Sequence, residues 1–380
     1  MVVLTAAVPV LSYVGFDAVL SSKAGRVLDP VNDPTKPGYE ANVAPTPVEL
    51  VANLSADGSL SALTVLALGN GDSGGGVLLV PVGTVIGGTG ADKDQTLTAA
   101  FAVGGEGALG RAASVVLGLG FDELSVLDDA RWAELVQPVA PITVNNPDPV
   151  LTPAFAAGEV QLTSDQVGPY LAARNDSESD LARLARHDAF WRGWLRAIGA
   201  SAAPGAVPGE TAAGLGRFVR GLANGAVTIE TLEVAAGQAV DTYAFDIVAG
   251  GAQLARLVPF PTGAEGARRV RLRVVDGVGV DGLAVVAAQR LVPAGAEIAV
   301  IGNADRFGYA STVVRYTDDV QRSTAEAMVK ALGLGAVEQV AVVDDVVELT
   351  IVVGNDFAAH YGSPTTISPP TDVTIESSGS

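Results

Sequence analysis

Apolar residues recur along this chain in two spacings, which predict strands in some segments and helices in others. Continuous apolar runs predict strands at Leu60–Leu68, Gly76–Pro81 and Leu97–Val103. The GNGDSGG stretch between the first two runs predicts a hairpin, because Gly, Asn and Asp tolerate the positive φ of tight turns. The clearest helix is predicted over residues 180–198, where apolar residues fall on one stripe at spacings of three, four and seven.

Shorter elements fill the region around these runs. The pattern predicts helices at 107–119 and 130–136, and strands at 124–127, 142–144, 228–232 and 243–247. From residue 268 onward, strands and helices alternate: a half-buried strand at 270–275, a helix at 282–291, strands at 297–302 and 311–316, a helix at 320–333, and a hairpin of 338–343 with 346–353 that turns at Asp344–Asp345. This alternation predicts a small α/β unit of about 90 residues at the end of the chain.

Composition divides the rest of the chain into segments. The uncharged run Val2–Phe16 is too short for a complete membrane span and has no basic residue before it, so a buried core segment and the outer end of an anchor both remain open. Five prolines within 24–48 predict a linker. We therefore expect these segments: 1–20, a linker at 21–48, a first domain at 49–260, a second domain at 268–358, and a mobile Ser/Pro/Thr-rich tail at 359–380.

Charge and cysteine content exclude several classes of function. The net charge is −19, with 42 acidic and 23 basic residues, so nucleic acid is not expected as a partner. Cysteine is absent, which excludes disulfides, thiolate nucleophiles and cysteine-based metal sites. Only two histidines are present, His187 and His360, and nothing near either of them predicts a metal site.

Three short motifs resemble known sites, but a turn explains each of them better. Gly71–Gly75 copies the serine loop of trypsin-like proteases, yet both histidines follow the serine, whereas those enzymes place the histidine before it. Gly105–Gly110 fits the GxGxxG of dinucleotide sites, but Glu106 would place a negative charge beside the pyrophosphate. Asp92–Thr96 resembles a phosphatase DxDxT, but no hydrophobic strand precedes it.

An arginine group near residue 180 carries more information. Arg174, Arg183 and Arg186 lie close together in sequence, with Asp180 among them, and Arg183 and Arg186 are three residues apart on one helix face. Guanidinium groups bind phosphate oxygens in pairs, so three converging arginines suit a diphosphate. The residues alone favour the other interpretation, in which these arginines form ion pairs with the nearby acids Asp176, Glu178 and Asp188.

Longer stretches resemble a known family. The run PYLAARNDSESDLARLARHDAFWRGWLRAI at 169–198 resembles the signature of the LytR-CpsA-Psr (LCP) family, in which a Tyr-x-Arg-x-Arg element leads to Asp-x-x-Arg-x-x-Arg-Gln at a helix start. Residues 97–147 resemble that family's middle, where a Gly-Gly turn opens a helix. Residues 268–357 resemble the LytR C-terminal domain, with Asp276–Gly277 in place of the usual Asn-Gly and a final Val-Val-Gly-Asn-Asp at 352–356.

The resemblance implies a fold and a location. The fold is α/β (α+β): an LCP-like mixed sheet flanked by helices at 49–260, then a small α/β LytR C-terminal-like domain at 268–358. It implies the extracytoplasmic face of the cell membrane of a Gram-positive bacterium, with residues 1–20 as the end of a single N-terminal anchor. Family members transfer a glycopolymer from a polyprenyl pyrophosphate lipid to peptidoglycan. Arginines hold the pyrophosphate, aspartates hold Mg²⁺, and an apolar cavity holds the lipid.

Carried over by position, the ligand-binding residues that match are Tyr170, Arg174, Asp180, Arg183 and Arg186. His187 stands where the family has Gln, and Ala172 stands where it has its first Arg. The family's Arg-Ser-Asp-Thr strand corresponds to residues 61–64 and its Pro-Arg-Asp to residues 81–83, and both segments lack the Arg and the Asp. No catalytic or metal-binding residue is therefore assigned.

The leading hypothesis is a pseudoenzyme. Its degenerate LCP-like domain binds a polyprenyl-phosphate-linked or wall glycan, or a wall-assembly partner, without catalysis and without a cofactor. The C-terminal domain is a candidate surface for a protein partner. One alternative is an active phosphotransferase that uses Mg²⁺ and acidic residues such as Asp92 or Asp94. The other alternative is a purely structural envelope scaffold.

Overall fold

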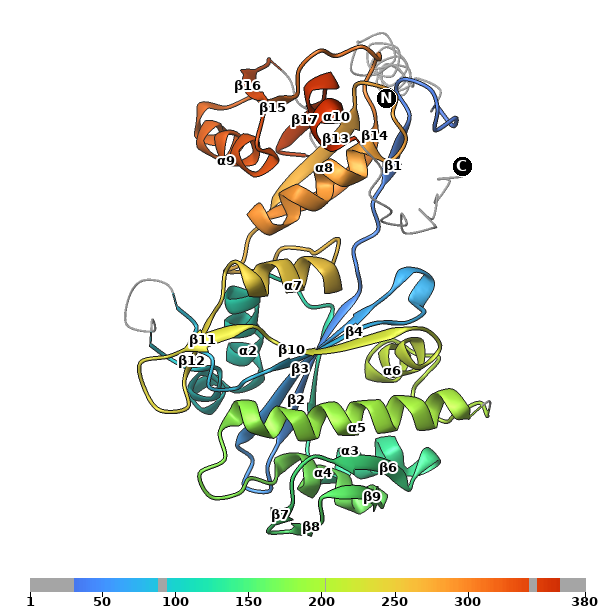
Figure 1. Cartoon of the computed structure of the whole chain (residues 1–380), viewed down its shortest axis with the longest axis vertical. Coiled ribbons are helices and arrows are strands. Elements are labelled where there is room, and N and C mark those ends of the chain that lie inside the picture. Colours follow the sequence, from blue (N-terminus) through green and yellow to red (C-terminus); the bar gives the residue numbers. More distant parts are fainter. Residues whose placement is uncertain (1–30, 88–93, 202, 342–346, 363–380) are drawn as a thin grey trace, which may run out of the picture.

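The computed structural model describes residues 31–87, 94–201, 203–341 and 347–362. In these residues the chain forms two larger mixed sheets, each covered by helices (Figure 1). The predicted α/β class, with an LCP-like mixed sheet followed by a smaller α/β unit, is confirmed. The segment expected to be a membrane anchor, residues 1–20, lies outside the described residues.

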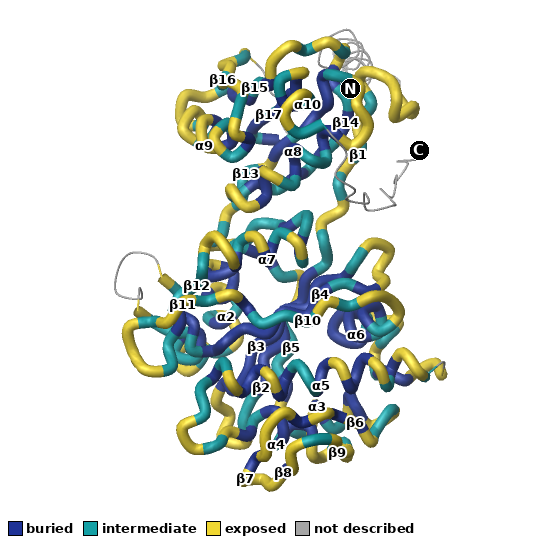
Figure 2. The backbone as a smooth tube through the Cα atoms, in the orientation of Figure 1, coloured by how far each residue is buried: buried dark blue, intermediate teal, exposed yellow. Residues whose placement is uncertain are grey.

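The first sheet has five strands in the order β10-β4-β3-β2-β5. Its strands are β2 (Val48–Leu54), β3 (Leu60–Leu68), β4 (Gly75–Val80), β5 (Glu123–Leu127) and β10 (Val227–Thr231). β2, β3 and β4 form an antiparallel meander, while β5 joins β2 and β10 joins β4 in parallel. All nine residues of β3 are buried because helices cover both faces of the sheet, which explains the continuous apolar run in its sequence (Figure 2).

Different helices cover the two faces of this sheet. On one face, α2 (Leu97–Leu117) and α7 (Ala249–Leu257) contribute to a core with strand residues such as Leu50 and Leu63. On the other face, the core around Val51 and Leu66 is closed by α3 (Asp129–Val136), α4 (Ser164–Ala172), α5 (Asp180–Ala200) and α6 (Leu215–Ala223). Short strand pairs decorate the domain: β6 (Ile142–Asn146) with β9 (Gly158–Leu162), β7 (Val150–Leu151) with β8 (Ala154–Phe155), and β11 (Val234–Ala236) with β12 (Tyr243–Phe245).

The second sheet has six strands in the order β1-β14-β13-β17-β15-β16. Its strands are β1 (Glu40–Asn42), β13 (Val270–Asp276), β14 (Ala296–Asn303), β15 (Val313–Tyr316), β16 (Ala336–Gln339) and β17 (Leu349–Val353). The helices beside it are α8 (Leu283–Leu291), α9 (Arg322–Leu332) and α10 (Asn355–Tyr361). Single 3₁₀ turns occur at Asn70–Asp72, Gln137–Val139, Val292–Ala294 and Asp319–Gln321.

Part of the expected linker belongs to this second sheet. β1 pairs antiparallel with β14, and the Gly38 amide donates to the Ala304 carbonyl at 2.8 Å. The Asn303 side chain donates to the carbonyls of Pro34 and Lys36, each at 2.8 Å. The expectation of a plain linker over 21–48 was therefore wrong for residues 40–42, because the edge of a distant strand supplies hydrogen bonds that no local pattern indicates.

Three further expectations were wrong. The strand predicted at 97–103 is the start of α2, which Thr96 caps by accepting from the Ala99 amide; the helix is interrupted at Gly104 and Gly105, where φ reaches +60° at Gly105. The predicted hairpin of 338–343 with 346–353 does not form, because β15 pairs with both β16 and β17, and its turn at 344–345 lies outside the described residues. Finally, α10 continues to Tyr361, beyond the predicted start of the tail at 359.

Candidate functional site

The predicted arginine group lies at the start of α5 and in the loop before it. The Ser179 hydroxyl caps this helix by accepting from the Ala182 amide at 3.1 Å, so α5 begins at Asp180 and carries Arg183 near its start. Farther along, Phe190 and Trp194 pack in a buried aromatic cluster with Trp132. These contacts fix the helix against the sheet, so its arginine-bearing end has a defined position.

Arg183 is held inside the protein by a carboxylate on its own helix. Its guanidinium donates to Asp180 at 2.6 Å, and both side chains are at most 4% exposed. The same nitrogen donates to the main-chain carbonyl of Ser61 on β3. Asp180 also accepts from the amide of Gly83, the third residue after β4, at 3.4 Å. The pair therefore connects α5 to two strands of the sheet.

Arg186 is buried in the same way, one turn farther along. It donates to Glu178 at 2.6 Å and to the Ala173 carbonyl at 2.6 Å, and it is 2% exposed. The Nε of Arg183 and the Nε of Arg186 have no hydrogen-bond partner among the described residues. Both cations are thus neutralised by protein carboxylates but retain one unused donor each.

Arg174 is the exposed member of the group, with 45% of its side chain accessible. Its Nε donates to the Glu178 carbonyl at 2.8 Å, and its terminal nitrogen donates to the carboxylate of Asp241, which lies 67 residues away in sequence. Asp241 also accepts from the Asp180 amide at 2.8 Å and from the Tyr243 hydroxyl at 2.5 Å. Burial raises the pKa of Asp241, but the hydrogen bonds outweigh it and hold the pKa below its usual value, so Asp241 is ionised.

The structure thus brings all three predicted arginines together. We call this set the arginine network: Arg174, Arg183, Arg186, Asp180, Glu178 and Asp241. It contains three cations and three carboxylates, so its formal charges cancel. The sequence could not indicate Asp241 or Tyr243, since both come from a hairpin distant in sequence and their spacing carries no signal. It indicated Glu178 only as a neighbour able to form an ion pair.

Tyr170 and His187 flank the network from the core. The Tyr170 hydroxyl donates to Asn146 at 3.1 Å, its ring meets Phe155 edge-on at 5.1 Å, and burial raises its pKa, so the phenol stays neutral. Burial, followed by the charges of Arg183 and Arg186, lowers the pKa of His187 to about 3. His187 is therefore neutral, and its Nε2 lies 2.9 Å from the Leu171 carbonyl. It adds no charge to the network.

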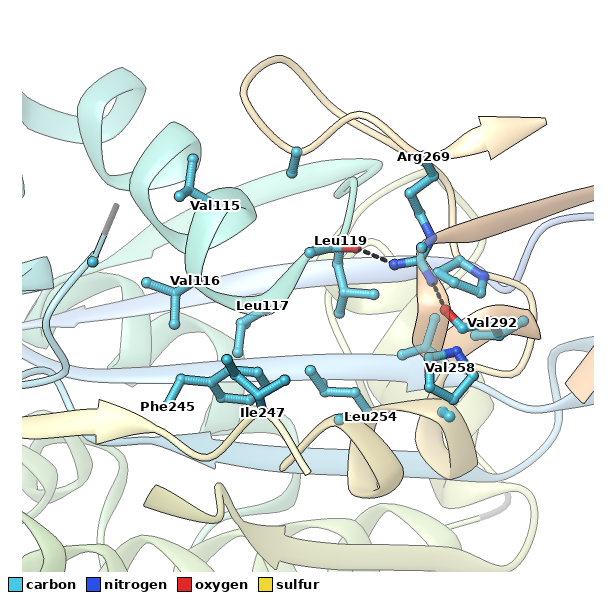
Figure 3. A pocket seen from close by; sticks show the side chains of 18 of the residues that line it. Val115, Val116, Leu117, Leu119, Phe245, Ile247, Leu254, Val258, Arg269 and Val292 are labelled. Carbon is cyan, nitrogen blue, oxygen red and sulfur yellow. Dashed lines mark hydrogen bonds between the residues drawn. The ribbon is translucent and has the colours of Figure 1, made fainter. Parts of the chain in front are cut away.

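An apolar cavity of about 510 Å³ lies elsewhere in the molecule (Figure 3). It is lined by the end of α2, by β12 and α7, and by the start of the C-terminal domain, and includes Leu117, Phe245 and Leu254. Arg269 spans one side, donating to the Gly118 carbonyl at 2.6 Å and to the Val292 carbonyl. Because α2 and α5 cover opposite faces of the sheet, this cavity is on the other side from helix 180–198, against which a lipid cavity was expected.

The distribution of acidic side chains and of long apolar helices bears on metal binding and membrane insertion. Within residues 31–87, 94–201, 203–341 and 347–362, no three acidic, histidine or cysteine side chains are grouped so that they could hold a metal ion. Asp94 is exposed, and Asp92 lies outside the described residues. In the same part of the chain, α2 is the one helix long and apolar enough to cross a membrane, but it packs against the sheet as a core helix does.

Comparison with known families gives one match. Residues 269–357 match the model of the LytR cell envelope-related transcriptional attenuator family. The predicted LytR C-terminal domain is confirmed. No curated protein matches the chain. The LytR C-terminal domain corresponds to the six-stranded sheet with α8, α9 and α10, apart from the edge strand β1, which comes from the other end of the chain.

Solved structures with a similar fold carry names from the family that the sequence resembles. A LytR-Csp2A-Psr enzyme from Actinomyces oris is 14% identical at a TM-score of 0.45, covering 57% of this chain and 94% of its own. TagV of B. subtilis is 17% identical at a TM-score of 0.40, covering 53% and 90%. A structure of TagT bound to LIIa-WTA is 15% identical at a TM-score of 0.43, covering 57% and 88%. At these TM-scores no activity or ligand is carried over to this chain.

Proposed function

We propose that this chain is an extracytoplasmic cell-envelope protein that binds a polyprenyl-phosphate-linked or wall glycan without catalysing its transfer. The observation that carries the proposal is the arginine network, in which three guanidinium groups lie together but each already faces a carboxylate. Guanidinium groups suit phosphate oxygens, which supports binding. The cell-envelope location is supported by the family that residues 269–357 match.

The neighbouring strand ends support the loss of catalysis. The positions that would supply Arg and Asp in an active relative are Ser61, Leu63, Val82 and Gly83. Ser61 lends its carbonyl to Arg183, Leu63 and Val82 are buried apolar residues, and a Cβ at Gly83 would collide with the Asp241 carbonyl. Removing one group that stabilises developing charge costs about 10²–10³ in rate, so replacing several leaves little transfer.

A turnover assay tests this proposal. The purified chain is incubated with a polyprenyl-pyrophosphate-linked glycan, Mg²⁺ and a peptidoglycan acceptor, and transfer and donor binding are measured in parallel. We expect saturable donor binding, weakened in Arg174→Ala but not in Arg192→Ala, and transfer no faster than without protein. Magnesium-dependent transfer that Arg174→Ala abolishes would establish the phosphotransferase instead. Absence of any donor binding would leave the structural scaffold.

A further inference from the structure

Asp241 occupies an unusual place for a surface aspartate. It sits in the turn between β11 and β12, with left-handed backbone at φ +57°. Its carboxylate accepts from three chemically different donors: the Arg174 guanidinium, the main-chain amide that opens α5, and the Tyr243 hydroxyl. A guanidinium, a helix N-terminus and a phenol are together the donors that a phosphate oxygen would use.

A second observation at the same helix end points to an anion larger than a carboxylate. Arg183 and Arg186 are each more than nine-tenths buried, and each keeps an Nε without a partner among the described residues. Buried donors are normally paired, so two unpaired guanidinium donors on successive positions of this face leave hydrogen-bonding capacity that Asp241 alone does not use. A tetrahedral phosphate offers more acceptor oxygens than a carboxylate does.

We propose that Asp241 is an internal anion that blocks the phosphate-binding position of the arginine network, and that a phosphate-bearing ligand binds by displacing it. This inference rests on the proposed function and adds how the site is controlled. With Asp241 in place, the network's three cations face three carboxylates, so an incoming anion meets no excess charge. With Asp241 displaced, one cation and the N-terminus of α5 become available.

The turn that carries Asp241 is held to the rest of the domain by few interactions. β11 and β12 pair over only three residues each, and Val240, next to Asp241, is 98% exposed. Within the turn, the Gly237 amide donates to the Thr242 carbonyl at 2.7 Å, so residues 237–242 are able to move as one unit. Tyr243 stays anchored through its main chain, which accepts from the Val85 amide at 2.8 Å.

The test measures pyrophosphate affinity of the full chain by isothermal titration calorimetry. Asp241→Asn keeps the shape of the side chain but removes its charge. We expect it to bind pyrophosphate at least about tenfold more tightly than the unaltered chain, because Arg174 is then free to form a charge-assisted hydrogen bond to the ligand. Asp188→Asn is the matched control, because it removes the same charge farther along α5, where Asp188 pairs with the exposed Arg192. Adding Arg174→Ala to Asp241→Asn should abolish the increase in affinity. Thermal unfolding verifies that each variant is folded.

A second arm uses vesicles containing polyprenyl phosphate and separates this inference from the proposed function. Equal pyrophosphate affinity in Asp241→Asn and the unaltered chain, or an equal increase in Asp188→Asn, overturns the inference. If the unaltered chain still binds the vesicles in that case, the proposed function stands. Tighter pyrophosphate binding in Asp241→Asn without any vesicle binding supports the blocked site but removes the lipid-linked ligand.

Discussion

Glu49 provides the sharpest test of how burial acts in the first domain. This side chain lies on β2 with no exposed surface, on the sheet face covered by α3 to α6. One carboxylate oxygen accepts from the Ser125 hydroxyl at 2.6 Å, and the other has no partner among the described residues. Burial, opposed by the Ser125 hydrogen bond and reinforced by Glu123 and Asp122, raises the pKa of Glu49 to about 7.

The raised pKa makes stability depend on pH with a definite sign. The folded pKa lies above the unfolded value of 4.5, so the protonated form is favoured on folding and carries no penalty below about pH 4.5. As pH rises through about 7, Glu49 ionises inside the core and stability is lost. The rise of the pKa corresponds to about 3 kcal/mol at pH 8.

Glu49→Gln removes this titration. We expect the variant's free energy of unfolding, relative to the unaltered chain, to be higher at pH 8 than at pH 5 by up to about 3 kcal/mol. The extra amide donor of Gln adds a cost at both pH values, so it cancels in this difference. Urea unfolding followed by tryptophan fluorescence reports the correct domain, because the chain's tryptophans are 132, 191 and 194, all in the first core.

The matched control is Glu134→Gln, which removes a carboxylate with 61% of its side chain exposed in the same domain. Its effect should be the same within about 0.5 kcal/mol at the two pH values. If Glu49→Gln shifts stability equally at pH 5 and pH 8, the carboxylate is not the titrating group that the burial argument requires, and the reasoning fails.

Three further outcomes follow from the same structure. Arg183→Met should destabilise the first domain by about 3–5 kcal/mol in urea unfolding, since it leaves a buried carboxylate unpaired, whereas the exposed Arg192→Met should cost below about 1 kcal/mol; equal losses would contradict the assignment of a buried pair. Phe190→Ala, in the aromatic cluster, should cost about 3–5 kcal/mol by the same assay, and a change under about 1 kcal/mol would argue against tight packing there. Asn303→Ala removes two hydrogen bonds to the segment before β1, so chymotrypsin should cut at Tyr39 sooner; unchanged cleavage would mean that strand pairing alone holds the segment.

Local pattern was sufficient where burial is uniform along an element. The predicted strand at Leu60–Leu68 coincides with β3, because both faces of this strand are covered and every position had to be apolar. Helix 180–198 is likewise contained in α5. The stretch 97–103 misled because its small and apolar residues fit a strand as well as the first turns of a helix, and the two glycines after it conceal the continuation.

Pairing between distant segments was beyond the reach of local pattern. β15 separates β16 from β17, so the apparent hairpin near the end of the chain is a crossover. The same limit applied to the site. Helical spacing indicated that Arg183 and Arg186 share a face, but not that Asp241 closes on Arg174. Whether these residues bind a ligand stays a prediction that the experiments above test.

The charge balance explains why a protein of this kind is suited to hold a phosphate group and poorly suited to transfer it. With 42 acidic against 23 basic residues, the long-range field repels anions. At the arginine network each guanidinium faces a carboxylate, so a phosphate that displaces Asp241 exchanges one anion for another instead of adding a new attraction. The free energy of such an exchange is the difference between two similar interactions, so most of the affinity for a lipid-linked ligand must come from its apolar part. Transfer makes a different demand, since charge grows on the leaving pyrophosphate and needs uncommitted donors, and a network whose cations are already neutralised supplies few of them.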